Sequence, residues 1–281
     1  MKTLKMLFGI TVFSMAVVFY SCEESANSVV EDQEVSVEIL NQLQELGFST
    51  HNVKKEDGGY VVEGDIFMSE DDIWALSEGS ALRTAAEEQY RTTNIVTGLP
   101  RVITVSVDSK LPSNFGPALD ECIDRYNNLN LDIAFQRITA GGKGKNKIVA
   151  DISIVAGPRK WNRPDHWGYI TLGQGGFPSG GDPYEEVKMN GEYFSTKAVN
   201  YVALVLAHEI GHNIGFRHTD FMDRSFSCGG GYANEGQAGV GAIHIPGTSV
   251  DAEYGSWMLS CADGGDRPFT NNDKAALDYL Y

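Results

Sequence analysis

The chain has 281 residues and a formal net charge of −16, from 38 acidic and 22 basic residues. A surface of this sign repels nucleic-acid phosphates and anionic lipid headgroups, so we expect no nucleic-acid partner. Hydrophobic residues make up 42% of the chain, which is enough for a packed core and argues against wholesale disorder. The acidity alone selects no substrate, because a solvated acidic surface explains it equally well.

Residues 1–21 have the pattern of an export signal. Lys2 and Lys5 precede an apolar run, residues 6–20, that is too short for an ordinary transmembrane helix. The Ser21-Cys22 pair that follows resembles the end of a bacterial lipoprotein signal, in which the Cys becomes the lipidated first residue. That resemblance implies an exported protein of the outer membrane or cell surface, with membrane contact only through a lipid on Cys22. An ordinary cleaved signal with an incidental Cys22 is the alternative.

Residues 22–35 are acidic and contain Ser, which is typical of a tether. Residues 36–98 form a smaller unit, which we interpret as a pro-segment. Its apolar residues predict a short amphipathic helix that ends at Gly47. An Asp-Gly-Gly turn at residues 57–59 then predicts a hairpin between residues 51–55 and 60–68. The charged residues 69–98 predict a helix and a loop.

Residues 99–281 have the pattern of a larger α+β domain. Ser195 is a candidate cap for a helix that runs to about Asn213, and Thr270 for a last helix over residues 271–281. The stretch 225–256 is rich in Gly and is typical of loops. Runs that alternate or are rich in β-branched residues predict four strands, at residues 101–107, 133–138, 148–154 and 167–172. One apolar run of helical spacing predicts a further helix, at residues 116–129.

The stretch from His208 to Asp220 carries a candidate metal site. On a helix, His208 and His212 lie one turn apart on the same face, so their imidazoles can share one ion. Gly215 can adopt the positive φ that turns the chain and brings His218 to the same ion. Three neutral imidazoles suit one catalytic zinc ion and leave a fourth position for water, whereas structural zinc sites usually have four protein ligands. Glu209 can take the proton of the attacking water as general base.

Residues 208–220 read H-E-x-x-H-x-x-G-x-x-H-x-D, which resembles the extended signature of the metzincin metalloproteases. Met258, within Ser256-Trp257-Met258, resembles their methionine turn. The motif His-Glu-Ile-Gly-His and the order of predicted elements in residues 101–281 look most like those of the bacterial dual-action HEIGH metallopeptidases.

The resemblance implies a metzincin-like zincin fold. That fold is a twisted, mostly parallel five-stranded sheet with one antiparallel edge strand, a long metal-binding helix and a C-terminal helix. Residues 167–172 are the candidate edge strand, with which an extended peptide substrate could pair.

The astacin branch of the metzincins offers a second resemblance. Astacin pro-segments carry a Gly-Asp whose carboxylate occupies the open position of the zinc, and Gly64-Asp65 looks similar. Asp65 is therefore a candidate latency ligand; the alternative is that it merely ends a hairpin strand. Astacins often have a further Tyr ligand two places after the turn methionine, but Ser260 stands there, so no such ligand is implied.

The remaining cysteines allow one disulfide. Cys122 lies on the apolar face of a predicted helix, which favours a buried thiol. Cys228 and Cys261 would then pair in an exported protein, although sequence alone does not establish the bridge.

The leading hypothesis is a secreted or surface-anchored zinc endopeptidase that hydrolyses peptide bonds of peptide or protein substrates. A surface adhesin that keeps the zinc fold with little turnover is the alternative from another class, and the intact Glu209 argues against it. A zinc amidase acting on cell-wall peptide would use the same chemistry. A cut within residues 86–98, near Arg91, would both release the pro-segment and free the domain from its anchor.

Overall fold

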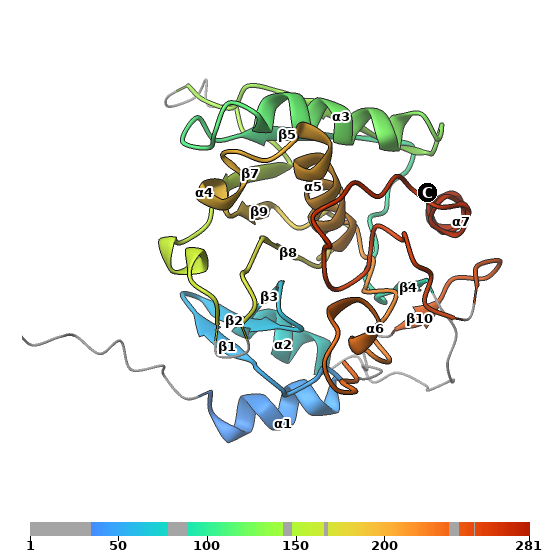
Figure 1. Ribbon diagram of the computed structural model, residues 1–281. Coiled ribbons are helices and arrows are strands. Elements are labelled where there is room, and N and C mark those ends of the chain that lie inside the picture. The colour runs from blue at the N-terminus through green and yellow to red at the C-terminus, as the bar shows by residue number, and fades with distance from the viewer. Residues whose placement is uncertain (1–34, 78–88, 143–147, 166–167, 236–241, 250) are drawn as a thin grey trace, which may run out of the picture. The chain divides into compact units, whose positions relative to one another are not determined.

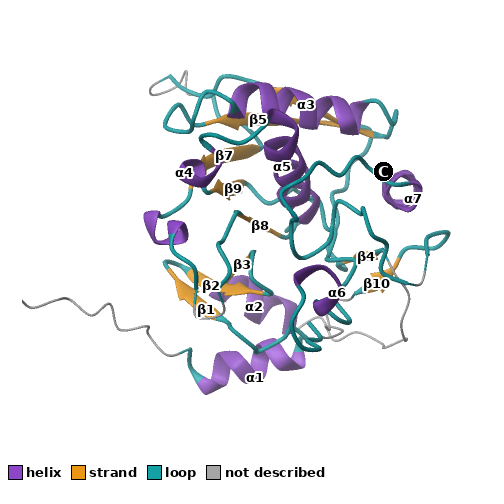
Figure 2. Ribbon diagram, viewed as in Figure 1, coloured by secondary structure: helices purple, strands orange, loops and turns teal. Residues whose placement is uncertain are grey.

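The computed structural model of the chain describes residues 35–77, 89–142, 148–165, 168–235, 242–249 and 251–281. Residues Gln33–Tyr281 form one compact unit (Figures 1 and 2). Cys22 and nearly all of the predicted tether lie outside the described residues. Within the described ranges, no helix has the length and apolar character needed to cross a bilayer.

The predicted pro-segment begins with helix α1 (Val37–Glu45), whose N-cap Ser36 accepts a hydrogen bond from the backbone N–H of Ile39. Three antiparallel strands follow where the sequence predicts two: β1 (Lys54–Glu56), β2 (Gly59–Val62) and β3 (Ile66–Ser69). Helix α2 (Glu70–Ser77) follows, before residues 78–88, which lie outside the described range. These elements share a small core of nine buried residues: Ile39, Leu43, Leu46, Phe48, Tyr60, Val62, Ile66, Met68 and Ile73.

The larger domain is built on a mostly parallel sheet. Strand β5 (Arg101–Val107) pairs in parallel with β6 (Ile133–Arg137) and with β7 (Ile152–Ala156). Strand β7 pairs in parallel with β9 (Glu186–Met189), which the sequence pattern did not predict. Strand β8 (Gly173–Gly176) runs antiparallel to β9. The predicted strand over residues 148–154 is displaced, since regular pairing begins only at Ile152.

The prediction of the edge strand is wrong in two respects. The antiparallel strand is β8, whereas the described residues 168–172 form no strand, and the N–H groups of Gly168 and Tyr169 bond to Asp165. Nor does β8 lie at an edge, because β3 pairs with it in parallel. The sheet therefore continues into the pro-segment in the order β1-β2-β3-β8-β9-β7-β5-β6.

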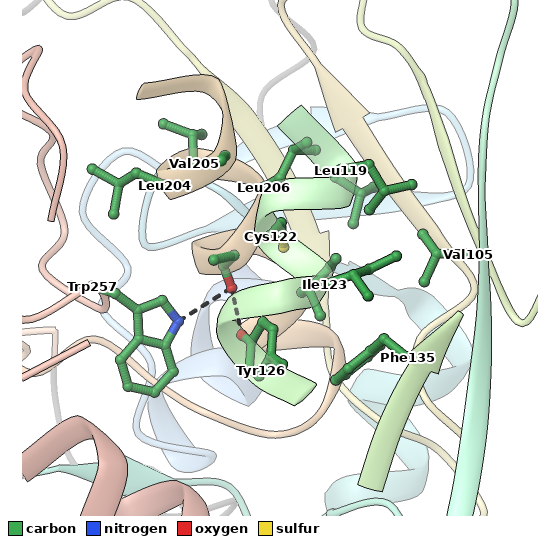
Figure 3. Packing of buried hydrophobic residues seen from close by; sticks show 14 of the residues in the cluster. Val105, Leu119, Cys122, Ile123, Tyr126, Phe135, Leu204, Val205, Leu206 and Trp257 are labelled. Atoms are coloured by element: carbon green, nitrogen blue, oxygen red, sulfur yellow. Dashed lines mark hydrogen bonds between the residues drawn. The ribbon is translucent and has the colours of Figure 1, made fainter. Parts of the chain in front are cut away.

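Two helices pack against each other beside the sheet: α3 (Phe115–Asn127) and α5 (Val199–Asn213). The Tyr126 hydroxyl of α3 and the indole N–H of Trp257 both donate to the carbonyl of Ala207 on α5, at 2.8 and 3.1 Å (Figure 3). Residues 201–213 of α5 are all buried, so this helix is held firmly within the core. Ser195 ends the short helix α4 (Gly191–Phe194) and does not cap α5, which begins after Ala198.

Residues 89–96 pack against the larger domain although they precede Leu99. Strand β4 (Tyr90–Arg91) pairs with β10 (Ile243–His244), and the N–H of Thr92 donates to the carbonyl of Gly215 at 2.8 Å. Tyr90, Thr92 and Val96 are buried.

The remaining described elements are short, apart from the last helix. They are η2 (Arg159–Asn162), α6 (Ser225–Cys228) and α7 (Asn271–Leu280). Thr270 caps α7, and Asp273 completes a capping box.

Candidate metal centre

Helix α5 and the turn after it bring three imidazoles together. The Nε2 atoms of His208 and His212 lie 3.1 Å apart, as their one-turn separation on α5 requires. Gly215 has φ +112°, a conformation that L side chains rarely adopt, and it turns the chain back after the helix. His218 then places its Nε2 atom 3.2 Å from that of His212. All three side chains are nearly or fully buried.

The other ring nitrogens fix how these imidazoles can act. His208 Nδ1 lies 2.8 Å from the carbonyl oxygen of Trp257, and His212 Nδ1 lies 2.8 Å from that of Phe216. A carbonyl oxygen only accepts hydrogen bonds, so each Nδ1 must carry the hydrogen. His218 Nδ1 lies 3.0 Å from a carboxylate oxygen of Glu235. The three Nε2 lone pairs therefore face one another, which is the arrangement of metal-binding histidines.

The donor set fits a tetrahedral metal ion. With metal–nitrogen bonds of about 2.0–2.1 Å, two ligand atoms of a tetrahedral zinc lie about 3.3–3.4 Å apart. The separations of 3.1 and 3.2 Å between the Nε2 atoms are close to that value. The residues present thus fit a bound divalent metal.

The carboxylate of Asp65, in the predicted pro-segment, lies at the point where the three imidazole nitrogens converge. Its Oδ2 atom lies 3.3 Å from the Nε2 of His218 and 3.6 Å from that of His208. The four side chains meet the distance expected of groups that share one ion. Although burial raises the pKa of Asp65, the neighbouring histidines more than offset this and hold that pKa well below its usual range. A negative carboxylate therefore faces the point where the three imidazoles converge.

The residues beside Asp65 form a second contact with the metal-binding loop. The guanidinium of Arg217, which directly precedes His218, donates to the carboxylate of Glu63, and both side chains are fully buried. The same guanidinium lies 5.1 Å from the ring centre of Phe48 in the pro-segment. Glu63 has φ +55°, which is uncommon for a residue with a Cβ atom. The predicted pro-segment thus reaches the metal-binding loop at two acidic residues that flank Gly64.

Glu209 lies between α5 and β8. Its carboxyl group is buried against Gly173, where any larger residue would collide with the Oε1 atom. Its Oε2 atom makes no hydrogen bond with the described residues. Burial, and then the charge of Asp65, raise the pKa of Glu209 well above its usual range. A carboxyl group in this state is suited to proton transfer.

The histidines differ in their protonation. Burial and the two neighbouring imidazoles hold the pKa of His212 well below its usual range, so it is neutral. Burial acts in the same direction on His218, but Glu235 and Asp65 outweigh it and hold the pKa of His218 well above its usual range. In the absence of metal, His218 therefore retains its proton.

The loop with Met258 lies against the metal-binding helix. A Cβ atom at Gly211 would lie 2.6 Å from the sulfur of Met258, so the two approach closely. The N–H of Thr219, next to His218, donates to the carbonyl of Met258 at 2.9 Å. Asp273 of α7 accepts hydrogen bonds from the Ser256 hydroxyl at 2.8 Å and from the side chain of Gln89 at 2.6 Å. Residues from three parts of the chain thus hold this loop in place.

A disulfide joins the loops that follow His218 and Met258. Cys228 and Cys261 are bonded, with their Cα atoms 5.1 Å apart. Asp220 spans the same two loops, accepting hydrogen bonds from the Ser227 hydroxyl and from the N–H of Ser260 at 2.5 and 2.9 Å. Cys122 is a buried free thiol, and burial raises its pKa to about 12.

The structure brings together the site residues expected from the sequence that lie within its described range. His208, His212, His218, Glu209 and Asp65 meet in one place, and Met258 lies beneath them. Several contributors carry no sequence signal, because their roles depend on contacts between distant loops: Glu63, Gln89, Arg217, Glu235 and Trp257.

The metal centre opens into a cavity of about 830 Å³. His208 and Glu209 line its wall, together with Gly64 and Asp65 of the pro-segment. The disulfide residues Cys228 and Cys261 and the loop after Met258 form part of the opposite wall. The reactive end of the centre thus faces a space large enough for side chains of a bound molecule.

Comparisons with known proteins point to a peptidase family. A family model described as dual-action HEIGH metallo-peptidase matches residues 60–281. No curated protein matches the chain. Two solved structures, described as the structure and the crystal structure of myroilysin, share 15% and 12% sequence identity with it. Their TM-scores are 0.32 and 0.38, and the matches cover 44% and 66% of this chain. The chain spans 52% of the first myroilysin structure and 86% of the second.

Proposed function

Because the chain belongs to the dual-action HEIGH metallopeptidase family, we propose that it is a zinc endopeptidase of the metzincin type. His208, His212 and His218 hold the metal, and Glu209 acts as general base. One observation carries the proposal: three Nε2 atoms converge with separations of 3.1 and 3.2 Å beside a buried carboxyl group.

The chain's own residues supply the proton transfer. A bound zinc ion would act as a Lewis acid on water and on the carbonyl group of the scissile bond. Glu209 accepts the proton of the attacking water and delivers it to the leaving amine. Burial, and then the charge of Asp65, raise the pKa of Glu209, and this increases its affinity for the proton that it takes from water. The buried Nδ1 contacts of His208 and His212 keep their rings oriented throughout.

The substrate is an extended peptide or protein, as expected of a peptidase. Export by the signal in residues 1–21 and anchoring through a lipid on Cys22 complete the proposal. The sequence pattern alone supports that location, because these residues lie outside the described range. No observation favours the adhesin, and the intact Glu209 would be without purpose in it.

Substitution of two residues tests the proposed function. Glu209→Gln should leave zinc bound, because the three imidazoles remain, and should lower turnover about 10²–10⁴-fold. His212→Ala should instead lose the metal. Metal analysis and cleavage of denatured casein are measured on both variants and on the wild type. A loss of less than about tenfold in Glu209→Gln would show that Glu209 is not the general base.

The pro-segment is proposed to keep the enzyme latent. The Asp65 carboxylate, within 3.3–3.9 Å of the three Nε2 atoms, lies where water would have to bind. Strand β3 directly after it pairs with β8, so the segment also covers backbone that an extended peptide would use. The buried ion pair between Glu63 and Arg217 also holds the chain next to Asp65 against the metal-binding loop.

Asp65→Ala tests this latency in the uncleaved chain. Removing the carboxylate should raise the rate of casein cleavage while leaving the backbone pairing of β3 intact. Asp57→Asn serves as control, because Asp57 is exposed in the same segment. Equal activity of the uncleaved wild type and the uncleaved Asp65→Ala chain would leave Asp65 with a structural role only.

A further inference from the structure

Beyond the metal centre, the cavity continues along one side of α5. Leu204 and Val205, one turn before His208, line it and lie on the side of α5 opposite to α3 (Figure 3). Leu259 and Ala262, from the loop after Met258, form the facing wall. This part of the cavity is therefore apolar and borders the reacting centre directly.

A substrate strand that pairs antiparallel with β8, which is the more stable of the two kinds of pairing, would enter this part with a defined end. Gly175 and Gly176 of β8 are covered by β3, whereas Leu172 and Gly173 border the cavity. A substrate strand antiparallel to β8 would have its N-terminal part at Gly176 and its C-terminal part near Gly173. The apolar cavity beside α5 would then receive the side chain that follows the scissile bond.

Polar side chains also line this part of the cavity, and one of them is a buried cation. Arg267 lines the cavity and is 8% exposed. It donates to the carbonyl of Cys261 at 2.7 Å, and its nearest carboxylate is that of Asp263, at 3.6 Å. The Asp263 side chain is 68% exposed, so water screens this pair and the partner is readily exchanged.

Two phenols complete the polar group around the guanidinium. Burial raises the pKa of Tyr201, nearby Tyr193 and Asp263 raise it further, and nearby Arg267 lowers it. Both tyrosines line the cavity. A substrate side chain that passes between the apolar walls would thus reach the two tyrosine hydroxyls and the guanidinium of Arg267. The carboxylate that now faces this guanidinium, that of Asp263, is mostly exposed to water.

We propose that Arg267 is a specificity-determining residue that selects an acidic side chain directly after the scissile bond. This inference rests on the proposed peptidase function. A Glu side chain has an apolar stem for the Leu204 and Val205 wall and a carboxylate that can replace Asp263 at the guanidinium. Gln has the same shape without the charge, so the pair isolates the electrostatic contribution.

The experiment uses active enzyme obtained by maturation of the full chain. A cleavage site in casein is first identified by mass spectrometry. Matched peptides of that site then carry Glu or Gln directly after the cut bond. The ratio of their kcat/KM values is measured for the wild type, Arg267→Met, Arg267→Lys and Asp263→Asn. Arg163→Met is the control, since Arg163 is exposed and does not line the cavity.

The wild type should prefer the Glu peptide by at least about tenfold, because a partly desolvated ion pair is made only with that peptide. The ratio should fall towards one in Arg267→Met, stay partly preserved in Arg267→Lys, and rise in Asp263→Asn, which removes the competing carboxylate. Arg163→Met should keep the wild-type ratio.

Equal cleavage of both peptides by the wild type overturns the proposal while leaving the peptidase function intact. An unchanged ratio in Asp263→Asn also overturns it, and this variant decides the matter if Arg267→Met fails to fold. Absence of casein cleavage by zinc-saturated enzyme in the first step overturns the proposed function, and this inference with it.

Discussion

At the scale of single residues, the three histidines differ in the hydrogen-bond partner of their Nδ1 atom. His208 and His212 bond to backbone carbonyls, whereas His218 faces the carboxylate of Glu235. The charge of Glu235 helps to hold the pKa of His218 above its usual range, and a protonated imidazole cannot bind metal. Metal affinity should therefore rise with pH, by about tenfold per unit, until the pH passes the pKa of His218.

Glu235→Gln should change this pH dependence. The pKa of His218 falls when the carboxylate is lost, so the rise in affinity should level off at a lower pH. Above that point zinc should bind about 10–100-fold more weakly, because His218 loses the partner that orients it. Zinc titrations of the Asp65→Ala background between pH 5 and 9, the range about the usual His pKa, measure both effects. Superimposable curves for Glu235→Gln and the exposed control Glu185→Gln would contradict this role.

The metal ligands were predictable at this scale, and their supporting residues were not. Spacing alone places His208 and His212 on one face, and Gly215 marks the turn that returns His218. Glu235 lies in a stretch rich in Gly, where no periodicity fixes the path of the chain. Arg217 looks like a solvated charge in the sequence, yet it is buried because Glu63, far upstream, supplies its partner.

At the scale of elements, the Cys228–Cys261 bridge should stabilise both loops around the metal. It closes a loop with a sequence separation of 33, and chain-entropy estimates for such a loop are about 3–4 kcal/mol. The free energy of unfolding should fall by this amount in Cys228→Ser, in Cys261→Ser and in the double variant. The three losses should be equal, because each variant removes the same bond. Chemical denaturation of the oxidised protein measures it. Additive losses from the two single variants would mean that the thiols act separately.

The strands show where sequence patterns fail for elements. Alternating runs identify β5 and β6, because their side chains face different surroundings on the two sides of the sheet. Strand β8 is Gly-Gln-Gly-Gly, which is typical of a loop. It forms a strand because Gly173 leaves space for Glu209 and because β9 and β3 both pair with its backbone. Strand β8 therefore depends on a contact with α5, and a contact between distant parts of the chain cannot be predicted from a local sequence pattern.

At the scale of the whole molecule, we expect the active unit to begin before Leu99. Tyr90 and Val96 are buried, and Gln89 bonds to Asp273 beneath the loop of Met258. A cut near Arg91, which the sequence suggested, would sever β4 within this packing.

Two truncated chains, beginning at Gln89 and at Leu99, test this boundary. The shorter chain loses a buried aromatic side chain and should be at least about 3 kcal/mol less stable. Denaturation of both chains with bound zinc measures the difference. Equal stability of the two chains would show that the catalytic domain begins at Leu99.

The pairing of β3 with β8 also bears on how safely the precursor can be exported. Once the pro-segment leaves, β8 becomes an outer strand with free N–H and C=O groups and almost no side chains to discourage another chain from docking. Copies that have lost the segment would be exposed to such association. In the proposed latent form, the segment that faces the metal centre therefore also covers this edge, and we expect it to protect the precursor against aggregation until it is removed.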